Sequence, residues 1–347
     1  MKILVLGGTE FVGRHFVGTA LVAGHEITLF NRGRRNPHLF PGVEKITGDR
    51  RQSLDGLLGG RYWDSILDTS GYLPSVVANS ARALQHRAAH YTFISTVSVY
   101  HASELPISEL SEVKVLAQQD LTSAESLVPG PCSTPGGGYG SSYGALKAQC
   151  ERECQSVFAG RNLIIRPGVI AGRWDYSGRF TYWVERLRRG GATVAPGSPS
   201  RPLRLLDVRD LAEWILRLIE QDVAGIYNAT GQDNLSMGSM LKRISDAVSH
   251  ASTLPILHWV PDHQLTSAGM RPMTSFPFWV TAENAMSLAI GNNAAVGRGL
   301  RFRSIADSAA DVAEWIACEN DAPIAGGLSQ AEEMLLLSTV PSPTSPA

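Results

Sequence analysis

Short apolar runs alternate with longer amphipathic stretches through the first half of the chain. We interpret the runs as strands: Lys2–Leu6, Glu26–Asn31, Glu44–Thr47, Ser65–Asp68, Tyr91–Ser95 and Leu163–Arg166. Between them, apolar residues recur with helical spacing over Phe11–Val22, Ser75–Leu84 and Tyr143–Ser156. Strands that alternate with helices favour right-handed crossovers and a parallel sheet covered on both faces. The pattern predicts a doubly wound α/β fold, which binds ligands at the carboxyl ends of its strands.

The second half of the chain is less regular. Its helical patterns are separated by turns rich in Pro and Gly, and they cover Phe180–Arg189, Val208–Glu220, Ser236–Val248 and Ile305–Cys318. We interpret this half as a smaller C-terminal lobe that covers the substrate, not as an independent domain. We expect a first domain over residues 1–166, the lobe over 167–337, partly interleaved with the first domain, and a disordered tail over 338–347.

Composition narrows the choice of partners. The 31 Lys and Arg residues balance 32 Asp and Glu residues, so charge gives no reason to expect nucleic acid or an acidic membrane as a partner. No run approaches the roughly 18 apolar residues of a membrane-spanning helix, and no signal peptide is apparent, so we expect a cytoplasmic protein. The four cysteines form no CxxC pair and have no His nearby, so we expect no metal site.

A glycine-rich turn follows the first predicted strand and opens the first predicted helix. Glycines in such a turn let the backbone approach a pyrophosphate, while the helix N-terminus offers unpaired N–H groups. This placement predicts a Rossmann domain that binds a dinucleotide. The residues expected to contact the cofactor here are Gly7, Thr9, Glu10, Phe11, Val12 and Gly13.

The end of the second predicted strand bears on the choice of cofactor. Asn31 and Arg32 stand where an acidic residue would bind the ribose 2′-hydroxyl of NAD, whereas Arg suits the 2′-phosphate of NADP. We therefore favour NADP(H) and keep NAD(H) open; the alternative for these arginines is a solvated basic loop. Further cofactor contacts are expected from Asp49, which would meet the adenine amino group, and from Arg50, Ser70 and Pro167.

Tyr143 and Lys147 stand four residues apart, which puts a phenol and an ammonium on one face of a helix. A free tyrosine has a pKa of about 10, and a neighbouring cation favours its phenolate. The phenol would then protonate a carbonyl oxygen as hydride arrives, or deprotonate an alcohol in reverse. Thr96, near the carboxyl end of the Tyr91–Ser95 strand, would offer a hydroxyl to the same oxygen.

Together these motifs resemble the extended short-chain dehydrogenase/reductases, often described as NAD-dependent epimerases and dehydratases. The resemblance spans Met1 to Trp214 and rests on the glycine-rich turn, Gly48-Asp49, Ser95-Thr96-x-Ser98-Val99-Tyr100, Tyr143-x-x-x-Lys147 and Arg166-Pro167-Gly168. It implies that Thr96, Tyr143 and Lys147 are catalytic. By the same resemblance Tyr143 and Lys147 also contact the cofactor, Lys147 holds the nicotinamide ribose, and the protein is a homodimer.

Departures from the family pattern bear on the substrate. Glu10 replaces a common Gly, so its carboxylate must point away from the phosphates. The residues after Thr96 lack the Asp-Glu pair of sugar-nucleotide 4,6-dehydratases, which argues against elimination of water. Val169 and Leu203 replace an Asn and a phosphate-binding Arg of the epimerases, although Arg201 and Arg204 flank Leu203. We therefore expect a substrate without a nucleoside diphosphate.

Substrate contacts are expected from Ser98, His101 and Tyr139. His101 replaces a family Gly after Val-Tyr; it either lines the pocket or faces solvent. The Gly136–Gly138 run is a candidate lid, because glycines tolerate hinge angles. Four aromatic residues either wall the pocket or pack the core of the lobe: Trp174, Tyr176, Tyr182 and Trp183.

The leading hypothesis is an NAD(P)(H)-dependent oxidoreductase that reduces a carbonyl, or oxidises an alcohol, of a small non-nucleotide metabolite. One alternative is a sugar or sugar-nucleotide epimerase with tightly bound NAD. Another is a non-catalytic homologue that senses a nucleotide or binds RNA. The sequence leaves open the identity of the substrate, the direction and the stereochemistry.

Overall fold

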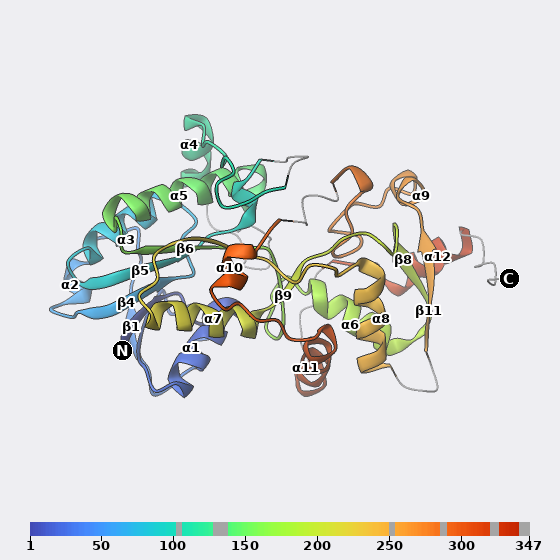
Figure 1. Ribbon diagram of the computed structural model, residues 1–347, viewed down its shortest axis with the longest axis horizontal. Coiled ribbons are helices and arrows are strands. Elements are labelled where there is room, and N and C mark those ends of the chain that lie inside the picture. Colours follow the sequence, from blue (N-terminus) through green and yellow to red (C-terminus); the bar gives the residue numbers. More distant parts are fainter. Residues whose placement is uncertain (102–105, 128–137, 250–253, 285–289, 320–325, 340–347) are drawn as a thin grey trace. The chain divides into compact units, whose positions relative to one another are not determined.

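A computed structural model describes residues 1–101, 106–127, 138–249, 254–284, 290–319 and 326–339. The chain divides into two compact units (Figure 1). Unit 1 comprises Met1–Gly168, Val208–Thr230 and Ile290–Arg301, and unit 2 comprises Val169–Asp207, Gly231–Ala289 and Phe302–Ala347. The sequence pattern allowed for interleaving beyond residue 166 but did not indicate which segments return to the first unit.

Unit 1 is built on a seven-stranded parallel sheet with the strand order β10-β6-β5-β4-β1-β2-β3. Its strands are β1 (Lys2–Leu6), β2 (Glu26–Asn31), β3 (Glu44–Thr47), β4 (Trp63–Asp68), β5 (Ala88–Ile94), β6 (Asn162–Pro167) and β10 (Gly225–Ala229). The doubly wound fold is therefore confirmed. The sequence pattern missed β10 and the first residues of β4 and β5, where the polar side chains of Asp64 and His90 interrupt the apolar run.

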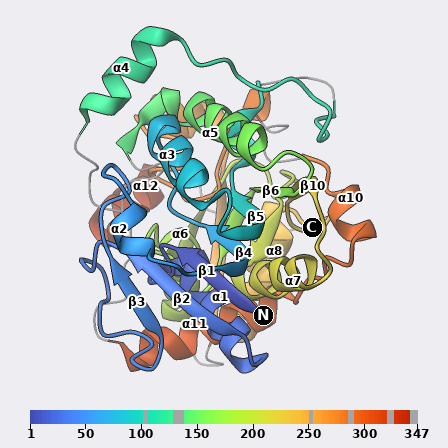
Figure 2. The same cartoon turned by 90° about the vertical axis from the view of Figure 1, so that its left-hand side faces the viewer.

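Helices cover both faces of this sheet (Figure 2). On one face lie α1 (Phe11–Val22) and α7 (Val208–Glu220), and on the other lie α3 (Pro74–Leu84) and α5 (Tyr143–Val157). The sequence pattern placed α7 in the second lobe, but this helix packs on α1. The strand order reverses between β1 and β4, which send their helices to opposite faces. A crevice outside the carboxyl ends of these two strands is where such folds bind ligands.

Unit 2 has two small parallel sheets and an aromatic core. The sheets pair β7 (Val169–Ala171) with β9 (Leu205–Asp207), and β8 (Gly191–Pro196) with β11 (Pro255–Val260). The helices are α6 (Arg179–Arg189), α8 (Met237–Val248), α9 (Asp262–Ser267), α11 (Ile305–Cys318) and α12 (Gln330–Thr339). Tyr182 and Trp183 are buried among Phe276, Trp279 and aliphatic side chains. Of the two interpretations of these aromatic residues, the structure thus supports packing of the lobe for Tyr182 and Trp183.

The predicted start of the disordered tail was wrong for two residues, because α12 continues through Ser338 and Thr339. The Ser338 hydroxyl donates to the Leu335 carbonyl at 2.7 Å, and the Thr339 hydroxyl donates to the Leu336 carbonyl at 2.8 Å. The rest of the predicted tail lies outside the described residues.

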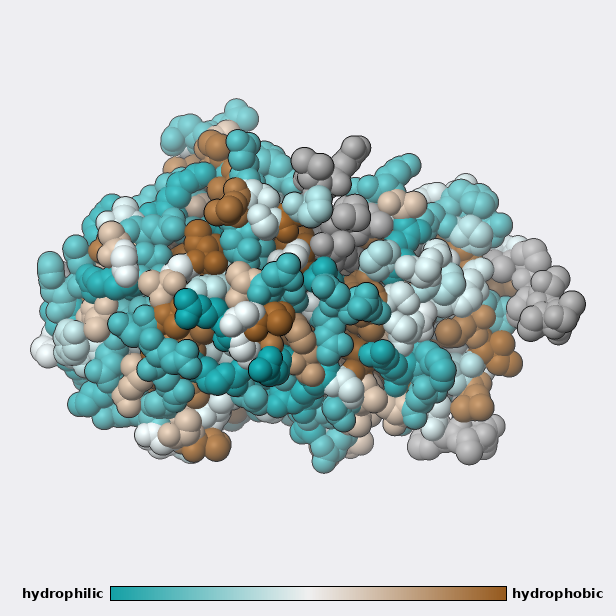
Figure 3. All heavy atoms as spheres, viewed as in Figure 1, coloured by the Kyte–Doolittle hydropathy of each residue, from teal (hydrophilic) through white to brown (hydrophobic). Residues whose placement is uncertain are grey.

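On the face drawn in Figure 3, hydrophobic residues form small separate spots among hydrophilic ones. Within the described part of the chain, no helix is both long enough and apolar enough to cross a membrane.

Candidate active site

The turn between β1 and α1 brings the backbone close to the first turn of the helix. A Cβ atom on Gly13 would lie 2.8 Å from the Cα atom of Gly8, so a side chain there would push the turn away from the helix. Gly7 has a φ of +111°, which an L-residue with a side chain rarely adopts. The α1 helix begins at Phe11, and its N-cap residue Glu10 makes no side-chain capping bond. This geometry leaves the helix N-terminus available to an anionic group.

The loop after β2 is tied to this turn by two asparagines. The Asn31 amide donates to the Gly7 carbonyl at 3.1 Å, and the Asn36 amide donates to the Thr9 carbonyl at 2.9 Å. Asn31 therefore shapes the turn, a role that the sequence did not suggest. The carboxylate of Glu10 lies 4.0 Å from Arg35 in the same loop.

Arg50 is buried beside Asp68, the last residue of β4. Its guanidinium donates to both carboxylate oxygens of Asp68, at 2.8 and 2.5 Å, and to the hydroxyls of Ser70 and Ser80 at 3.0 and 2.8 Å. The Tyr91 hydroxyl also donates to Asp68, at 2.8 Å. Burial alone would raise the pKa of Asp68, but the charge and hydrogen bonds of Arg50 hold it below its usual range. Arg50 thus fixes the hydroxyl of Ser70 by a hydrogen bond. Direct contact between this guanidinium and a cofactor stays a prediction.

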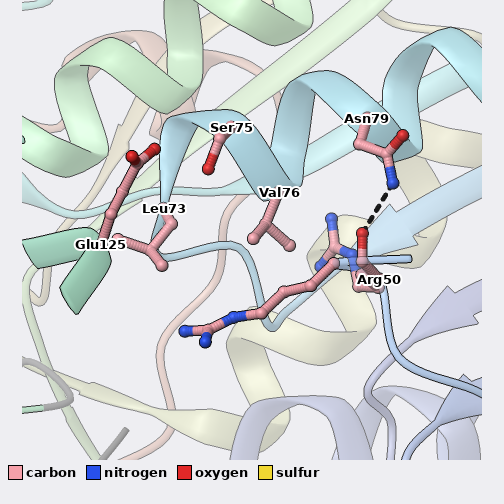
Figure 4. Close-up of a pocket in the computed structure, with 7 residues that line it drawn as sticks. Arg50, Leu73, Ser75, Val76, Asn79 and Glu125 are labelled. Atoms are coloured by element: carbon pink, nitrogen blue, oxygen red, sulfur yellow. Dashed lines mark hydrogen bonds between the residues drawn. The ribbon is translucent and has the colours of Figure 1, made fainter. Parts of the chain in front are cut away.

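A pocket of about 280 Å³ opens beside this ion pair (Figure 4). Its lining residues come from the loop after β3, from the start of α3 and from α4 (Gln118–Ser126): Arg50, Arg51, Leu73, Ser75, Val76, Asn79 and Glu125. The Asn79 amide donates to the Arg50 carbonyl at 2.7 Å (Figure 4). It also donates to the Gln52 carbonyl at 2.9 Å and so joins α3 to this loop. Asp49 accepts a hydrogen bond from the Arg51 backbone at 3.0 Å. The pocket therefore combines apolar side chains with polar groups next to the predicted adenine contact.

Lys147 lies on the face of α5 that packs against the sheet, and only 3% of it is exposed. Its ammonium donates to the carbonyls of Gly71 and Ile94, at 2.7 and 2.6 Å, just beyond β4 and at the end of β5. The nitrogen also lies 4.0 Å from the centre of the Phe93 ring. Burial lowers the pKa of Lys147. The cation is thereby fixed at the carboxyl edge of the sheet.

The segment that carries Thr96 packs directly against α5. Thr96 caps the short 3₁₀ helix η1 (Val97–Val99), accepting from the Ser98 backbone at 3.1 Å and donating to the Ser98 hydroxyl at 3.2 Å. A Cβ atom on Gly144 would overlap the carbonyl oxygen of Ser98, so only glycine permits this contact between α5 and η1. The fold therefore brings the segments of Thr96, Tyr143 and Lys147 together, and their catalytic roles stay a prediction.

A cluster of three tyrosines adjoins this centre. The Tyr72 ring stacks on Tyr139, with ring centres 6.1 Å apart, and lies 6.3 Å from the Tyr143 ring. The Lys147 nitrogen is 5.4 Å from the centre of the Tyr72 ring. Burial raises the pKa of Tyr139. Tyr72 was not among the predicted site residues, although its position just after β4 was a usable signal.

The remaining predicted residues are spread around the same edge. Ser98 and His101 are exposed, Arg32 is exposed in the loop after β2, and Pro167 is buried at the end of β6. Val12 is half-buried in the first turn of α1. Most of the Gly136–Gly138 run and Cys132 lie outside the described residues. Burial raises the pKa of the Cys150 thiol to about 12, which makes a reactive thiolate there unfavourable.

Comparison with known proteins agrees with this fold. A model of the NAD dependent epimerase/dehydratase family matches residues 3–230. The chain belongs to this family, and the resemblance inferred from its motifs is confirmed.

Two curated relatives differ from each other in what their names describe. The chain is 25% identical over 265 residues to the chloroplast stem-loop binding protein of 41 kDa b of Arabidopsis thaliana, covering 71% of this chain and 63% of that protein. It is 23% identical over 237 residues to the 3-beta-hydroxysteroid dehydrogenase of Mycolicibacterium neoaurum, covering 65% of this chain and 62% of that protein. The chain thus matches less than two thirds of the length of either relative.

Solved structures share the fold at low identity. The Bordetella bronchiseptica enzyme WbmH in complex with NAD+ has a TM-score of 0.64 at 14% identity, over 91% of this chain and 98% of that one. The dTDP-glucose 4,6-dehydratase of Bacillus anthracis in complex with NAD has a TM-score of 0.62 at 12% identity, over 92% and 98% of the two chains. At these identities the likeness concerns the fold alone.

Proposed function

We propose that the protein is an NAD(P)(H)-dependent oxidoreductase that reduces a carbonyl, or oxidises an alcohol, of a small non-nucleotide metabolite. One observation carries this proposal. The ammonium of Lys147 is held by the Gly71 and Ile94 carbonyls at the edge of the sheet, one helical turn from Tyr143 and next to the Thr96 segment.

The residues divide the chemistry between them. When bound, the dinucleotide would supply or accept the hydride. The Tyr143 phenol gives its proton to the carbonyl oxygen in the reductive direction. The single proton of the Thr96 hydroxyl goes to the Ser98 hydroxyl in the structure, so this hydroxyl would turn to donate its hydrogen bond to the carbonyl oxygen instead. The buried charge of Lys147 favours the phenolate that remains on Tyr143.

The cofactor would lie along the crevice between β1 and β4. Its pyrophosphate would meet the turn where Gly8 and Gly13 leave no room for a side chain. The pocket beside Asp49 would take the adenine ring, since Leu73 and Val76 are apolar and Ser75 and Asn79 are polar. The exposed Arg32, with no acidic residue beside it at the end of β2, supports NADP(H) over NAD(H).

The substrate would lack a nucleoside diphosphate. Leu203 stands where epimerases of the family place a phosphate-binding Arg, and it is only 2% exposed, packed in the apolar core of unit 2. Val169 likewise offers no amide to a sugar diphosphate. Both departures support a small metabolite over a sugar nucleotide.

The test begins with the cofactor. The purified protein is denatured, any released nucleotide is identified by mass, and the apo form is titrated with NADPH and NADH before a panel of aldehydes and ketones is assayed. Little retained nucleotide, tighter binding of NADPH and turnover that Tyr143→Phe abolishes would support the proposal. Stoichiometric NAD that survives purification would instead indicate an epimerase, and the reductase assignment would be withdrawn.

A second candidate is a non-catalytic role in binding RNA, which the name of the chloroplast stem-loop binding relative favours. The formal net charge of −1 argues against it. Titration of an RNA hairpin at two salt concentrations separates the two roles. Tight, salt-dependent binding that Tyr143→Phe leaves unchanged would favour the non-catalytic role.

A further inference from the structure

A buried ion pair lies one helical turn beyond Lys147 on α5. Glu151 accepts two hydrogen bonds from Arg166 of β6, at 2.9 and 2.6 Å. The two side chains are only 3% and 4% exposed. Burial alone would lower the pKa of Arg166, but the hydrogen bonds and charge of Glu151 raise it above its usual value. The pair joins the helix that carries Tyr143 and Lys147 to the sheet.

The same pair reaches both sides of Thr96. The Ser95 hydroxyl, just before Thr96, donates to Glu151. The Tyr100 hydroxyl, just after η1, accepts from Arg166 at 2.7 Å and donates to Asn228 of β10 at 2.8 Å. One network of side chains therefore spans α5, both ends of the Thr96 segment, β6 and β10.

We propose that Glu151 and Arg166 are positioning residues, which hold the Thr96 segment and the Tyr143–Lys147 face of α5 in the mutual alignment that proton transfer requires. The proposal rests on the oxidoreductase function proposed above. Neither residue contacts the substrate or the cofactor in this role. They act through Ser95 and Tyr100 on one side and through the α5 backbone on the other.

A positioning role has a different signature from a purely stabilising one. A misplacement of about 1 Å at a reacting centre lowers turnover by about 10²-fold even when binding is little changed. A pair that only stabilises the fold would leave turnover of the folded fraction unchanged.

Unit 2 supplies a matched control. Arg186 donates to Glu333 at 2.6 Å, both side chains are 6% exposed, and Glu333 also accepts from the Val194 backbone at 3.0 Å. This pair has the same residue types and a similar burial, but it joins α6 to α12 within a unit that contains neither Tyr143 nor Lys147.

The experiment compares Glu151→Gln with Glu333→Gln. For each variant, kcat, the Kd of NADPH, the thermal midpoint and the hydrogen exchange of the α5 amides are measured. We expect Glu151→Gln to lower kcat by about 10²-fold with NADPH affinity nearly unchanged, and to speed exchange at Gly144–Lys147. We expect Glu333→Gln to lower the thermal midpoint without either effect.

A double variant, Glu151→Met with Arg166→Met, guards against loss of folding, because apolar side chains of similar volume often replace a buried ion pair without loss of stability. A folded double variant with low kcat would support the proposal, and one with full kcat would overturn it. Equal exchange at Gly144–Lys147 in the two Gln variants would also overturn it. That result does not depend on turnover, so absence of activity in the unaltered protein would count against the proposed function alone.

Discussion

The two units bury charge in different places. In unit 1 the buried charges gather at the carboxyl edge of the sheet, where Arg50 meets Asp68, Lys147 meets two carbonyls and Glu151 meets Arg166. Unit 2 buries the pair of Arg186 and Glu333 where α6 meets α12, and its core otherwise consists of tryptophan, phenylalanine and aliphatic side chains. Buried charge is expensive to desolvate and tends to mark functional sites, whereas an apolar core serves stability. We therefore expect substitutions at the carboxyl edge of the sheet in unit 1 to change turnover, cofactor binding or stability. Substitutions in the core of unit 2 should change stability alone.

The largest expected effect is on turnover. Tyr143→Phe should lower kcat by about 10²- to 10⁴-fold, the usual contribution of a general acid or base. Because Tyr143 is partly exposed and keeps its ring in the variant, the free energy of unfolding should hardly change. The control is Tyr62→Phe, a tyrosine of the same unit that is 55% exposed. Equal loss of kcat in both variants would contradict the assignment.

Arg50→Leu should lower the free energy of unfolding by about 3–5 kcal/mol, because it leaves the carboxylate of Asp68 buried and unpaired. Denaturant titration measures the change. Arg61→Leu removes the exposed pair with Glu44 and should change it by about 1 kcal/mol or less. The double variant Arg50→Leu with Asp68→Leu should recover part of the loss; a further loss in the double variant would rule out the unpaired charge as the cause.

Trp183→Ala should also lower the free energy of unfolding by about 3–5 kcal/mol, by opening a cavity in the core of unit 2. The affinity of the folded protein for NADPH should stay the same, because unit 2 contributes none of the predicted nucleotide contacts. Leu335→Ala, at a position 70% exposed, should change stability by about 0.5 kcal/mol or less. A weaker NADPH affinity in Trp183→Ala would mean that the core of unit 2 influences cofactor binding as well as stability.

Lowering the pH should reveal how much the Asp68 carboxylate contributes to the free energy of unfolding. Its pKa is lowered in the folded protein, so its stabilisation is present above the unfolded value of about 3.9 and is lost as the pH falls through the lower folded value. The difference in unfolding free energy between the unaltered protein and Asp68→Asn should be constant from neutral pH to about pH 5. It should shrink in more acidic solution. A difference that grows towards acid would contradict this direction.

The smallest expected effect concerns the choice of cofactor. Arg32→Ala should weaken NADPH binding by up to about fivefold, the scale of an exposed charge pair, and leave NADH binding unchanged. Fluorescence titration of both nucleotides measures the ratio. Arg34→Ala, an exposed arginine of the same loop, is the control. If neither NADPH nor NADH binding changed, the alternative of a solvated basic loop would be favoured; equal weakening of both would contradict a contact with the 2′-phosphate.

Local patterns were enough to predict most of the first sheet. The bounds of β1, β2 and α1 agree with the prediction because each is a continuous apolar or amphipathic segment with a clear turn beside it. The strand β10 escaped notice because its partner β6 lies far away in the chain, and a short strand is recognised mainly by its neighbours. Long-range pairing thus limited the fold prediction.

The residues of the candidate site likewise divide into those that a local motif predicts and those that only long-range contacts reveal. Tyr143, Lys147 and the glycine-rich turn carry short motifs, so their place could be predicted. The contact of Arg50 with Asp68 and that of Glu151 with Arg166 join residues on different elements, and no spacing in the sequence indicates such pairs. Tyr72 was missed because its position just after β4 was its only signal, with no motif beside it.

The division of unit 1 among three stretches of chain has a consequence for its synthesis. Strand β6 pairs on one side with β5 and on the other with β10, which comes more than fifty residues later in the chain. The ribosome must therefore synthesise the segment 169–207 of unit 2 before β10 exists and can complete the sheet beside β6. During that interval β6 is an open edge, the kind of surface to which other chains pair. A nascent chain paused there, or a fragment that ends at Gly168, should need a chaperone to remain unaggregated.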